Sequence, residues 1–415
     1  MKKYKFSIIT PTHKNSIFLL ELYQSIKRQS YSNWEWILYL NGDFKGKLID
    51  KEILADKRVF IFDTNKSFKN IGEIKYNAFN LATGDILVEV DHDDMIHCDC
   101  LAELNKSYQN DDVGFVYSDS LLYDLQGKMK PWDKSLGWKY SMEEYNKKSF
   151  IRHLGFRPTS RSLAFIWYAP DHVRSWRKSV YDAIGGHNKS LEVCDDHELL
   201  IRTYLYTNFH HIKKCLYYYR ILPDMTNTQF LRNELIQKKT YELFLQYAQS
   251  LAEREADINN KLKIDLGGGI NPLNGYKTID LLDADINCDL NDGIPLEDDS
   301  VGVINASHII EHLRDPLKTM REIYRVLCDG GWAFIEVPST DGRGAWQDPT
   351  HVSYWNQNSF WYYTRESYAK YIRNTEIRFQ EYRLDTSFWE DNIAVTNAWL
   401  CAIKSKKRRP HKINI

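Results

Sequence analysis

Short apolar segments alternate with stretches of helical periodicity along the chain of 415 residues. The first apolar segment spans residues 6–10, and the spacing of Leu20, Tyr23 and Ile26 after it predicts a helix. This alternation of strands and helices is typical of α/β domains with largely parallel sheets. The pattern begins a second time at Leu262. We therefore expect two α/β domains.

The domain boundaries follow from changes in this pattern. Residues 228–260 have roughly helical spacing and become more polar towards Asn260, which predicts a last helix of the first domain that runs into a connector. The end of the chain is a short basic run, which we interpret as a solvated tail. The predicted division is a first domain over 1–230, a helical connector over 231–260, a second domain over 261–405 and a tail over 406–415.

Composition and charge exclude several classes of protein. The chain has 55 Lys and Arg against 56 Asp and Glu, a net charge of −1. A nucleic-acid-binding protein needs a basic surplus to neutralise phosphates, so we expect no nucleic-acid partner. No apolar run approaches the length of a membrane span, which leaves at most peripheral membrane contact. The seven cysteines are an odd number, which fits a reduced, cytoplasmic setting better than a disulfide framework.

Polar residues follow two predicted strands of the first domain. One strand ends before Asn41 and Asp43, and the strand over 86–90 ends before Asp91 and Asp93. Ligands of open α/β sheets bind at the carboxyl ends of the strands. Residues two apart in an extended chain point the same way, so Asp91 and Asp93 face one site, and two carboxylates suit Mg²⁺ or Mn²⁺. An acidic turn that caps the next helix explains this pair equally well.

Longer motifs of the first domain are similar to those of a known enzyme family. The domain contains SIITPTHKN, LNGD and NIGEIKYNAFNLATGDILVEVDHDD, followed by SWRKSVYDAIGGHNKSLEVCDDHELLIR. Over roughly residues 5–230 these motifs resemble the family 2 glycosyltransferases of the GT-A fold. The resemblance implies a domain that binds a nucleotide-sugar, with a UDP-sugar favoured. It also implies inverting transfer of the sugar to a glycan or lipid-linked oligosaccharide.

The resemblance also implies roles for individual residues. Asp93 would hold Mn²⁺ or Mg²⁺, with Asp91 as a second metal ligand near the ribose. Asp196 is expected to act as the general base that deprotonates the acceptor hydroxyl, with Asp195 as the runner-up. Family members usually have an acidic residue at the position of Asn41, which leaves the nucleotide base, uracil or another, open. The implied donor contacts are Pro11, Thr12, His13, Asn41, Asp43, Lys75, Asp91 and His92.

The second domain opens with a strand that ends in three glycines at 267–269. Glycines there let the backbone approach a bound nucleotide closely, and Asp280 at the end of the next strand would accept hydrogen bonds from a ribose. An ordinary tight turn explains the glycines alone. Only residues 270–275 separate the first two strands, too few for a crossover helix.

Further motifs of the second domain narrow the interpretation. Together with DINCDL, IPLEDDSVGVINASHIIEHL and CDGGWAFIEVP, the glycine turn resembles a compact branch of the class I S-adenosylmethionine-dependent methyltransferases. The resemblance covers roughly 261–405 and implies a Rossmann-like fold, with closing antiparallel strands over 377–384 and 397–404. The implied cofactor contacts are Asp265, Gly267, Gly268, Gly269, Asp280, Asp289, Leu290 and Ser307.

Three histidines are candidates for the base that activates the methyl acceptor. His308 and His312 follow the fourth strand of the second domain, and His351 follows the fifth. A histidine titrates near neutral pH, as such a base should. Each one alone is more often a structural residue, but together they predict at least one contact with the substrate. Metal binding by these histidines is the less favoured alternative.

The fusion of the two domains predicts a bifunctional enzyme of surface polysaccharide biosynthesis. Such an enzyme would add a sugar to a glycan and methylate the same glycan. The alternative is a glycosyltransferase with a single activity, whose methyltransferase-like module only binds or positions the substrate.

Overall fold

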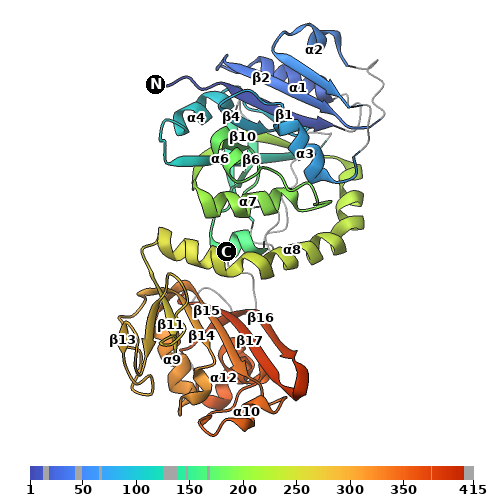
Figure 1. The fold of residues 1–415 in the computed structure, drawn as a ribbon. Coiled ribbons are helices and arrows are strands. Elements are labelled where there is room, and N and C mark those ends of the chain that lie inside the picture. The colour runs from blue at the N-terminus through green and yellow to red at the C-terminus, as the bar shows by residue number, and fades with distance from the viewer. Residues whose placement is uncertain are drawn as a thin grey trace. The chain divides into compact units, whose positions relative to one another are not determined.

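The structure is a computed structural model of the chain, and it divides into two compact units, Met1–Ala248 and Gln249–Asn414 (Figure 1). The division falls inside helix α8 (Pro223–Ile258), so the predicted connector is part of one continuous helix. All seven cysteines are free thiols. The structure describes residues 1–12, 18–42, 49–64, 68–124, 138–145, 148–165, 169–374 and 376–405.

Unit 1 is built on one mixed sheet of ten strands among its described residues. Eight of them follow the order β3-β2-β1-β4-β9-β6-β10-β5, and the hairpin of β7 and β8 joins at β6. The first four strands of this order are parallel, and β9 runs antiparallel to both of its neighbours. The strands are β1 (Phe6–Thr12), β2 (Trp34–Leu40), β3 (Val59–Asp63), β4 (Ile86–Glu89), β5 (Met95–Ile96), β6 (Val113–Asp124), β7 (Lys139–Tyr145), β8 (Lys148–Leu154), β9 (Arg174–Arg177) and β10 (Asn208–Ile221).

Helices pack against this sheet and complete the core of unit 1. Strands β2 and β4 are buried along their whole length, which explains why they are near-continuous apolar runs in the sequence. Helix α1 buries Tyr23, whose ring stacks on Trp36 of β2 at a centroid distance of 6.0 Å. The helices before α8 are α1 (Phe18–Lys27), α2 (Lys51–Ala55), α3 (Ile71–Phe79), α4 (Cys100–Ser107), α5 (Ser160–Phe165), α6 (Lys178–Ala183) and α7 (Asp195–Tyr206).

Unit 2 contains a seven-stranded sheet in the order β13-β12-β11-β14-β15-β17-β16. Its first five strands are parallel, and β17 runs antiparallel to β15 and to β16. The two closing strands pair antiparallel, as expected, and because β16 is antiparallel to β17 it runs in the direction of the parallel strands. The strands are β11 (Leu262–Leu266), β12 (Lys277–Asp280), β13 (Ile286–Asn287), β14 (Val301–Ser307), β15 (Leu327–Pro338), β16 (Phe379–Phe388) and β17 (Ala394–Ala402).

The helices of unit 2 are short apart from α9 (Pro316–Val326). Helix α9 begins as the sequence predicts, because the Asp315 carboxylate accepts hydrogen bonds from the backbone of Leu317 and Lys318, both at 3.0 Å. The described backbone between β11 and β12 contains no helix, as expected from its length. The short helices of unit 2 are η2 (Ile310–His312), α10 (Gly344–Gln347), η3 (Gln357–Phe360), α11 (Trp361–Thr364), α12 (Glu366–Ala369), η4 (Lys370–Ile372) and η5 (Glu390–Asn392).

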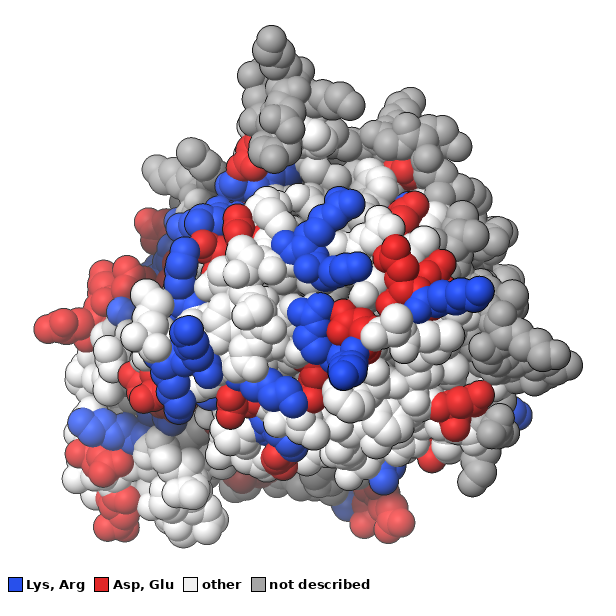
Figure 2. Space-filling view, turned by 90° about the horizontal axis from the view of Figure 1, so that it is seen from above, with Lys and Arg blue, Asp and Glu red and all other residues white. Residues whose placement is uncertain are grey.

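Two surface properties agree with the composition. Lys and Arg side chains are interspersed with Asp and Glu side chains on the face shown in Figure 2, as the net charge of −1 predicts. In the described parts of the chain, no helix combines the length and the apolar character that a membrane crossing requires.

Helix α3 is held close to the loop before α7 through Gly72. The Gly72 N–H donates to the Leu191 carbonyl at 3.1 Å, and a Cβ at this position would lie 2.0 Å from the Asn188 carbonyl oxygen. We predict that Gly72→Ala lowers the free energy of unfolding of unit 1 by about 1–3 kcal/mol, because the backbone must move apart to admit the methyl group. Urea denaturation measures this change.

The matched control for this substitution is Gly344→Ala in helix α10. A Cβ there would meet only Ile393 Cγ2, at an ordinary contact distance of 3.4 Å. Its unfolding free energy should stay within about 0.5 kcal/mol of the wild type. Equal effects of the two substitutions would contradict the proposed close approach at Gly72.

Candidate active sites

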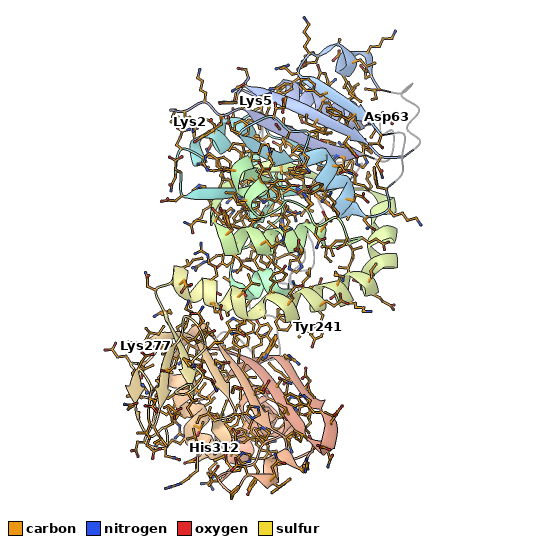
Figure 3. The ribbon with its side chains drawn as sticks, in the orientation of Figure 1. Lys2, Lys5, Asp63, Tyr241, Lys277 and His312 are labelled. Carbon is orange, nitrogen blue, oxygen red and sulfur yellow. The ribbon has the colours of Figure 1, made fainter. Side chains whose placement is uncertain are left out.

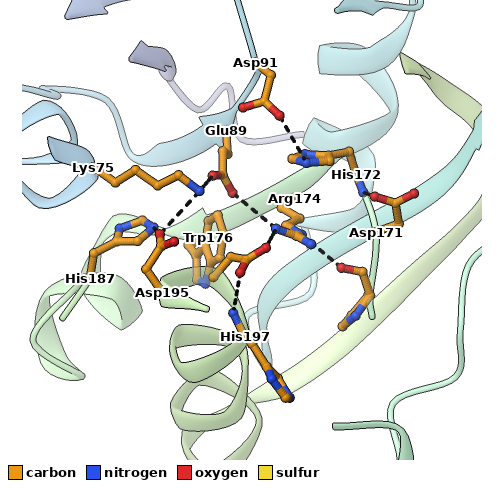
Figure 4. A network of polar contacts seen from close by, with 12 residues as sticks. Lys75, Glu89, Asp91, Asp171, His172, Arg174, Trp176, His187, Asp195 and His197 are labelled. Atoms are coloured by element: carbon orange, nitrogen blue, oxygen red, sulfur yellow. Dashed lines mark hydrogen bonds and ion pairs between the residues drawn. The ribbon is translucent and has the colours of Figure 1, made fainter. Parts of the chain in front are cut away.

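Five charged side chains lie together at the carboxyl end of β4 in unit 1 (Figure 4). Lys75 Nζ lies 2.6 Å from Glu89 Oε1 and 3.3 Å from Asp195 Oδ2. Arg174 Nη1 donates to Asp196 Oδ2 at 2.7 Å and lies 3.9 Å from Glu89 Oε2. Two cations therefore face three carboxylates in one buried cluster, which we call the ion network.

The fold brings the ion network together from four elements. Glu89 is the last residue of β4, and it pairs with Arg174, the first residue of β9, in the antiparallel register of these strands. Lys75 comes from α3, and Asp195 and Asp196 form the first turn of α7. Glu89 is fully buried. A buried carboxylate needs close cations to offset its lost hydration, so Glu89 depends on its two partners.

The ion network shifts the pKa values of its carboxyl groups in different directions. Burial raises the pKa of Asp195 to about 6, although Lys75 opposes this shift. Burial also acts on Asp196, but the Arg174 guanidinium outweighs it and holds the pKa of Asp196 below its usual range. In the same way Lys75 and Arg174 overcome burial and lower the pKa of Glu89. At neutral pH all three groups are therefore ionised.

The residues after β4 form the second part of this site. The Asp93 side chain is mostly buried, and burial raises the pKa of Asp93. The Asp91 side chain is 39% exposed and lies 3.6 Å from His172 Nε2. His92 Nδ1 lies 3.9 Å from Asp93 Oδ1. The Asp91 carboxylate reaches solvent. Carboxylate oxygens are the hard ligands that Mg²⁺ and Mn²⁺ prefer, so Asp91 and Asp93 fit such an ion by their chemistry.

Asp94 belongs to the same segment but has a structural role. Its carboxylate accepts hydrogen bonds from the Tyr217 hydroxyl at 2.8 Å and from the Arg220 backbone N–H at 2.7 Å. The Arg220 guanidinium in turn donates to the Asp93 carbonyl at 2.7 Å. Strand β10 therefore fixes the backbone that presents Asp91 and Asp93.

The predicted base-binding residues lie at the ends of β1 and β2. Pro11 and Thr12 end β1, and the Asn41 N–H donates to the Thr12 carbonyl at 2.8 Å. The Asn41 side chain donates to the Phe68 carbonyl at 3.2 Å and accepts from the Phe68 N–H at 2.9 Å. Asn41 therefore anchors the loop at residue 68, and its contact with a nucleotide base stays a prediction. His13 and Asp43 lie outside the described residues.

The glycine turn of unit 2 is a close-packed backbone cradle. Gly267 has a φ of +77°, and a Cβ there would lie 2.9 Å from Ile309 Cβ. The Gly269 N–H donates to Asp280 Oδ2 at 3.1 Å. A Cβ at Gly268 would lie 2.4 Å from Asp265 Oδ2. A Cβ at Gly269 would lie 2.6 Å from the Leu282 carbonyl oxygen. The chain's own atoms thus exclude side chains at all three positions, and the contact of this turn with a nucleoside cofactor stays a prediction.

The other predicted cofactor contacts of unit 2 lie at the ends of neighbouring strands. Asp265 is buried and accepts from the Asn305 side chain at 2.7 Å and from the Leu273 N–H at 2.9 Å, so it holds the turn in place. Asp289 is exposed, and hydrogen bonds from Asn291 hold the pKa of Asp289 below its usual range. Leu290 is buried, and Ser307 is an exposed residue at the end of β14.

All three predicted histidines of unit 2 surround the buried carboxylate of Glu311. His308 Nδ1 lies 3.6 Å from Glu311 Oε1, and its Nε2 lies 3.2 Å from Glu336 Oε1. These two carboxylates raise the pKa of His308 to about 9, which disfavours it as a base at neutral pH. The rings of His312 and His351 lie 5.0 Å apart. In Figure 3 His312 lies at the end of unit 2 opposite Lys277, which begins β12.

The two units match two family models. Residues 7–165 match the model of glycosyl transferase family 2, and residues 234–378 match a model described as a methyltransferase domain. The chain joins a family 2 glycosyltransferase domain to a methyltransferase domain. The predicted fold class, α/β with a GT-A domain and a Rossmann-like methyltransferase domain, is thereby confirmed.

Individual relatives of the glycosyltransferase–methyltransferase chain are distant. Glycosyltransferase GlyG of Streptococcus pneumoniae is 27% identical over 121 residues, which cover 28% of this chain and 40% of GlyG. The uncharacterised protein y4gI of Sinorhizobium fredii is 22% identical over 227 residues, 52% of this chain and 22% of y4gI. The matched part is therefore less than half the length of either relative.

Solved structures similar to this chain include two with bound nucleotide-sugars. Residues 1–349 of S. aureus TarS, in complex with UDP-GlcNAc, are 14% identical, with a TM-score of 0.42 over 65% of this chain and 76% of that one. Mannosyltransferase PcManGT from Pyrobaculum calidifontis, in complex with GDP-Man and Mn²⁺, is 14% identical, with a TM-score of 0.44 over 61% of this chain and 70% of that one.

Sequence reasoning missed several residues of both domains. In the glycosyltransferase domain it did not single out Glu89 or Arg174, although a glutamate inside the apolar run 86–90 is a detectable signal. The partner of that glutamate depends on the register of β4 and β9, which the sequence does not show. In the methyltransferase domain it overlooked Glu311, whose burial is visible only in the fold.

We predict that Arg174→Met lowers the free energy of unfolding of the glycosyltransferase domain by about 3–5 kcal/mol, because it leaves Glu89 and Asp196 short of a buried cation. Urea denaturation, with the transition of each domain followed separately, measures the loss. The control is Lys178→Met, which removes a solvent-accessible ion pair with Asp182 and should cost less than about 1 kcal/mol. A loss for Arg174→Met as small as that of the control would contradict the role of the ion network.

We also predict that Asp195→Asn gains stability relative to the wild type as the pH rises from about 4 to about 6. The pKa of Asp195 is about 6 in the folded chain and about 3.9 in an unfolded one. Between these values the folded state alone binds the proton, so the wild type loses unfolding free energy with rising pH. Asparagine does not titrate, and the variant lacks this loss, which amounts to about 3 kcal/mol.

The neighbours of Asp195 keep their charge states in this pH range. Lys75 stays protonated because its pKa is raised, and Glu89 and Asp196 stay ionised because their pKa values are lowered. Burial lowers the pKa of His187 to about 3, which keeps His187 neutral. Urea denaturation of both proteins at several pH values gives the comparison. A constant stability difference between them from pH 4 to pH 6 would refute the raised pKa.

Proposed function

We propose that the chain is a bifunctional enzyme that transfers a sugar from a nucleotide-sugar to a glycan, with inversion, and methylates the glycan with S-adenosylmethionine. The observation that carries the proposal is the ion network, which holds Asp195 and Asp196 beside the strand end that presents Asp91 and Asp93. Surface polysaccharide biosynthesis in the cytoplasm is the favoured setting, with a UDP-sugar as donor and a glycan or lipid-linked oligosaccharide as acceptor.

In the glycosyltransferase domain, Asp93 and Asp91 would hold Mn²⁺ or Mg²⁺. Such an ion neutralises charge on a departing nucleoside diphosphate. The candidates for contacts with the donor among the described residues are Pro11, Thr12, Asn41, Lys75 and His92, with Asp91 near the ribose. We assign the general base to Asp196.

Exposure and charge both support Asp196 as the base. Its side chain is 20% exposed, whereas that of Asp195 is 4% exposed, so an acceptor hydroxyl can reach Asp196 more easily. Arg174 orients the Asp196 carboxylate and keeps it ionised, which leaves it ready to accept a proton. Asp195 serves mainly to position Lys75.

In the methyltransferase domain, Gly267, Gly268 and Gly269 would receive S-adenosylmethionine, with Asp280 at the ribose and Asp289 near the adenine. The cofactor supplies an electrophilic methyl group. The task of the chain is then to exclude water from the cofactor and to direct an acceptor hydroxyl at it. His312 and His351, beside Glu311, are the residues best placed to meet that hydroxyl.

Two substitutions separate the activities. Asp196→Asn should lower kcat for sugar transfer by about 10²–10⁴-fold, the usual contribution of a general base, while release of S-adenosylhomocysteine persists. Asp280→Ala should abolish S-adenosylhomocysteine binding, while hydrolysis of the nucleotide-sugar, or transfer of its sugar to an acceptor, persists. Both activities are measured on the full chain, with thermal unfolding as the check that each variant folds.

Other outcomes distinguish the alternatives. A wild-type chain that binds nucleotide-sugar but not S-adenosylhomocysteine would identify the methyltransferase-like domain as a positioning scaffold. Asp195→Asn with a larger loss of kcat than Asp196→Asn would move the base to Asp195. Methyl transfer to a protein or a small metabolite instead of a glycan would refute the proposed acceptor.

A further inference from the structure

Glu311 in unit 2 is a buried carboxylate with no hydrogen bond to either of its oxygens among the described residues. It is 2% exposed. Three histidines face its Oε1 atom: His308 Nδ1 at 3.6 Å, His351 Nε2 at 3.9 Å and His312 Nε2 at 4.0 Å. A buried carboxylate without hydrogen bonds is costly. His308 is its nearest charged partner, but His308 is shared with Glu336, so a further cation beside Oε1 would complete the pairing of Glu311.

The rings of His312 and His351 are oriented by hydrogen bonds on their far sides. His351 Nδ1 lies 3.0 Å from the Ala345 carbonyl, and His312 Nδ1 lies 3.2 Å from the Thr350 carbonyl. A carbonyl only accepts, so each Nδ1 carries a proton, and in the neutral rings each Nε2 turns a lone pair towards Glu311. Three electron-pair donors thus converge, with ligand atoms within 4.8 Å of one another.

We propose that Glu311, His312 and His351 bind one divalent transition-metal ion, of which Zn²⁺ is the representative. Imidazole nitrogens with a carboxylate oxygen are a preferred donor set for such ions. Two ligand atoms that share a zinc ion lie at most about 4 Å apart, since each lies about 2.0–2.2 Å from it. The two histidine nitrogens lie 3.9 and 4.0 Å from Glu311 Oε1, and all three ligand atoms lie within 4.8 Å of one another, so binding of the ion would draw the two rings inward.

The surroundings match those of metal ligands in two further respects. A metal-bound histidine usually donates its other N–H to a carbonyl or carboxylate, which is the arrangement of both rings here. His308 stays outside the ligand set because its Nε2 pairs with Glu336. Three protein ligands leave a coordination position open, as catalytic zinc sites do, and the His312 side chain is 33% exposed, so that position reaches solvent.

The open position suits an oxygen ligand of the substrate. A hydroxyl bound to such an ion has a lower pKa and becomes a better nucleophile. Trp346 and Tyr354 are both exposed, and their rings stack at a centroid distance of 4.4 Å. They directly follow Ala345, whose carbonyl contacts His351, and Ser353, whose hydroxyl donates to the Ile310 carbonyl beside Glu311. An acceptor sugar is the ligand class that fits, and this step alone rests on the proposed methylation of a glycan.

The test is Zn²⁺ binding by the metal-free full chain, measured by calorimetry, with Co²⁺ absorption as a probe of imidazole ligation. We expect one Zn²⁺ site that survives Asp93→Ala, which removes the first of the two predicted metal ligands of the glycosyltransferase domain. Glu311→Gln and His351→Gln should each weaken binding by about 10-fold or more. His210→Gln in unit 1 is the matched control and should leave binding unchanged.

Folding and function are separated from metal binding by two further measurements. His312→Gln alters a partly exposed side chain, so it tests the site even where Glu311→Gln lowers the folded fraction. Thermal unfolding measures the stability of each variant. Absence of Zn²⁺ binding, or equal affinity in all three ligand variants and the wild type, would overturn the site. Zn²⁺ binding without methyl transfer would leave the site intact and overturn the proposed methyltransferase function.

Discussion

The burial of Glu89 is the constraint on which the glycosyltransferase site depends. This carboxylate, at the end of a central strand, has lost its hydration. Lys75 Nζ at 2.6 Å from Oε1 and Arg174 Nη1 at 3.9 Å from Oε2 take the place of the lost water. Each cation reaches a second carboxylate on α7, which fixes the first turn of that helix against the sheet. One buried charge thus sets the positions of α3, β9 and α7 together, and removing a partner of such a charge costs several kcal/mol.

The methyltransferase domain has a buried carboxylate of its own, but with different partners. Glu311, like Glu89, lies close to the ends of parallel strands, yet no Lys or Arg is paired with it in the described residues. Histidines take that place, and two of them are oriented as neutral donors of electron pairs. The third, His308, is shared with Glu336. A permanent pair with Lys or Arg is a structural solution, whereas a carboxylate that faces the lone pairs of two imidazoles suits a bound cation. The contrast explains why we assign Glu89 to folding and Glu311 to ligand binding.

Periodicity and motifs were enough to predict the two α/β domains, the carboxylates after β4 and the glycine turn, because each is a property of a short segment. The pairing of Glu89 with Arg174 was not predictable, because it depends on which strands become neighbours and in which register. Asn41 shows a third limit. Its position at the end of β2 follows from the sequence. Its side chain, however, is engaged with the Phe68 backbone, which lies beyond α2 and β3 in the sequence.

Charge balance links the ion network to the chemistry proposed for it. At neutral pH two cations face three carboxylates, so the buried cluster carries one excess negative charge. Uptake of a proton by Asp196 from an acceptor hydroxyl cancels that charge, whereas a balanced cluster would become positive. Two adjacent carboxyl groups, Asp195 and Asp196, have pKa values shifted in opposite directions, a pattern that separates acid and base roles in enzymes. The lowered pKa of Asp196 keeps this carboxylate ionised before transfer, and Asp196 is also the more exposed of the two, so it is the one that we assign to take the proton.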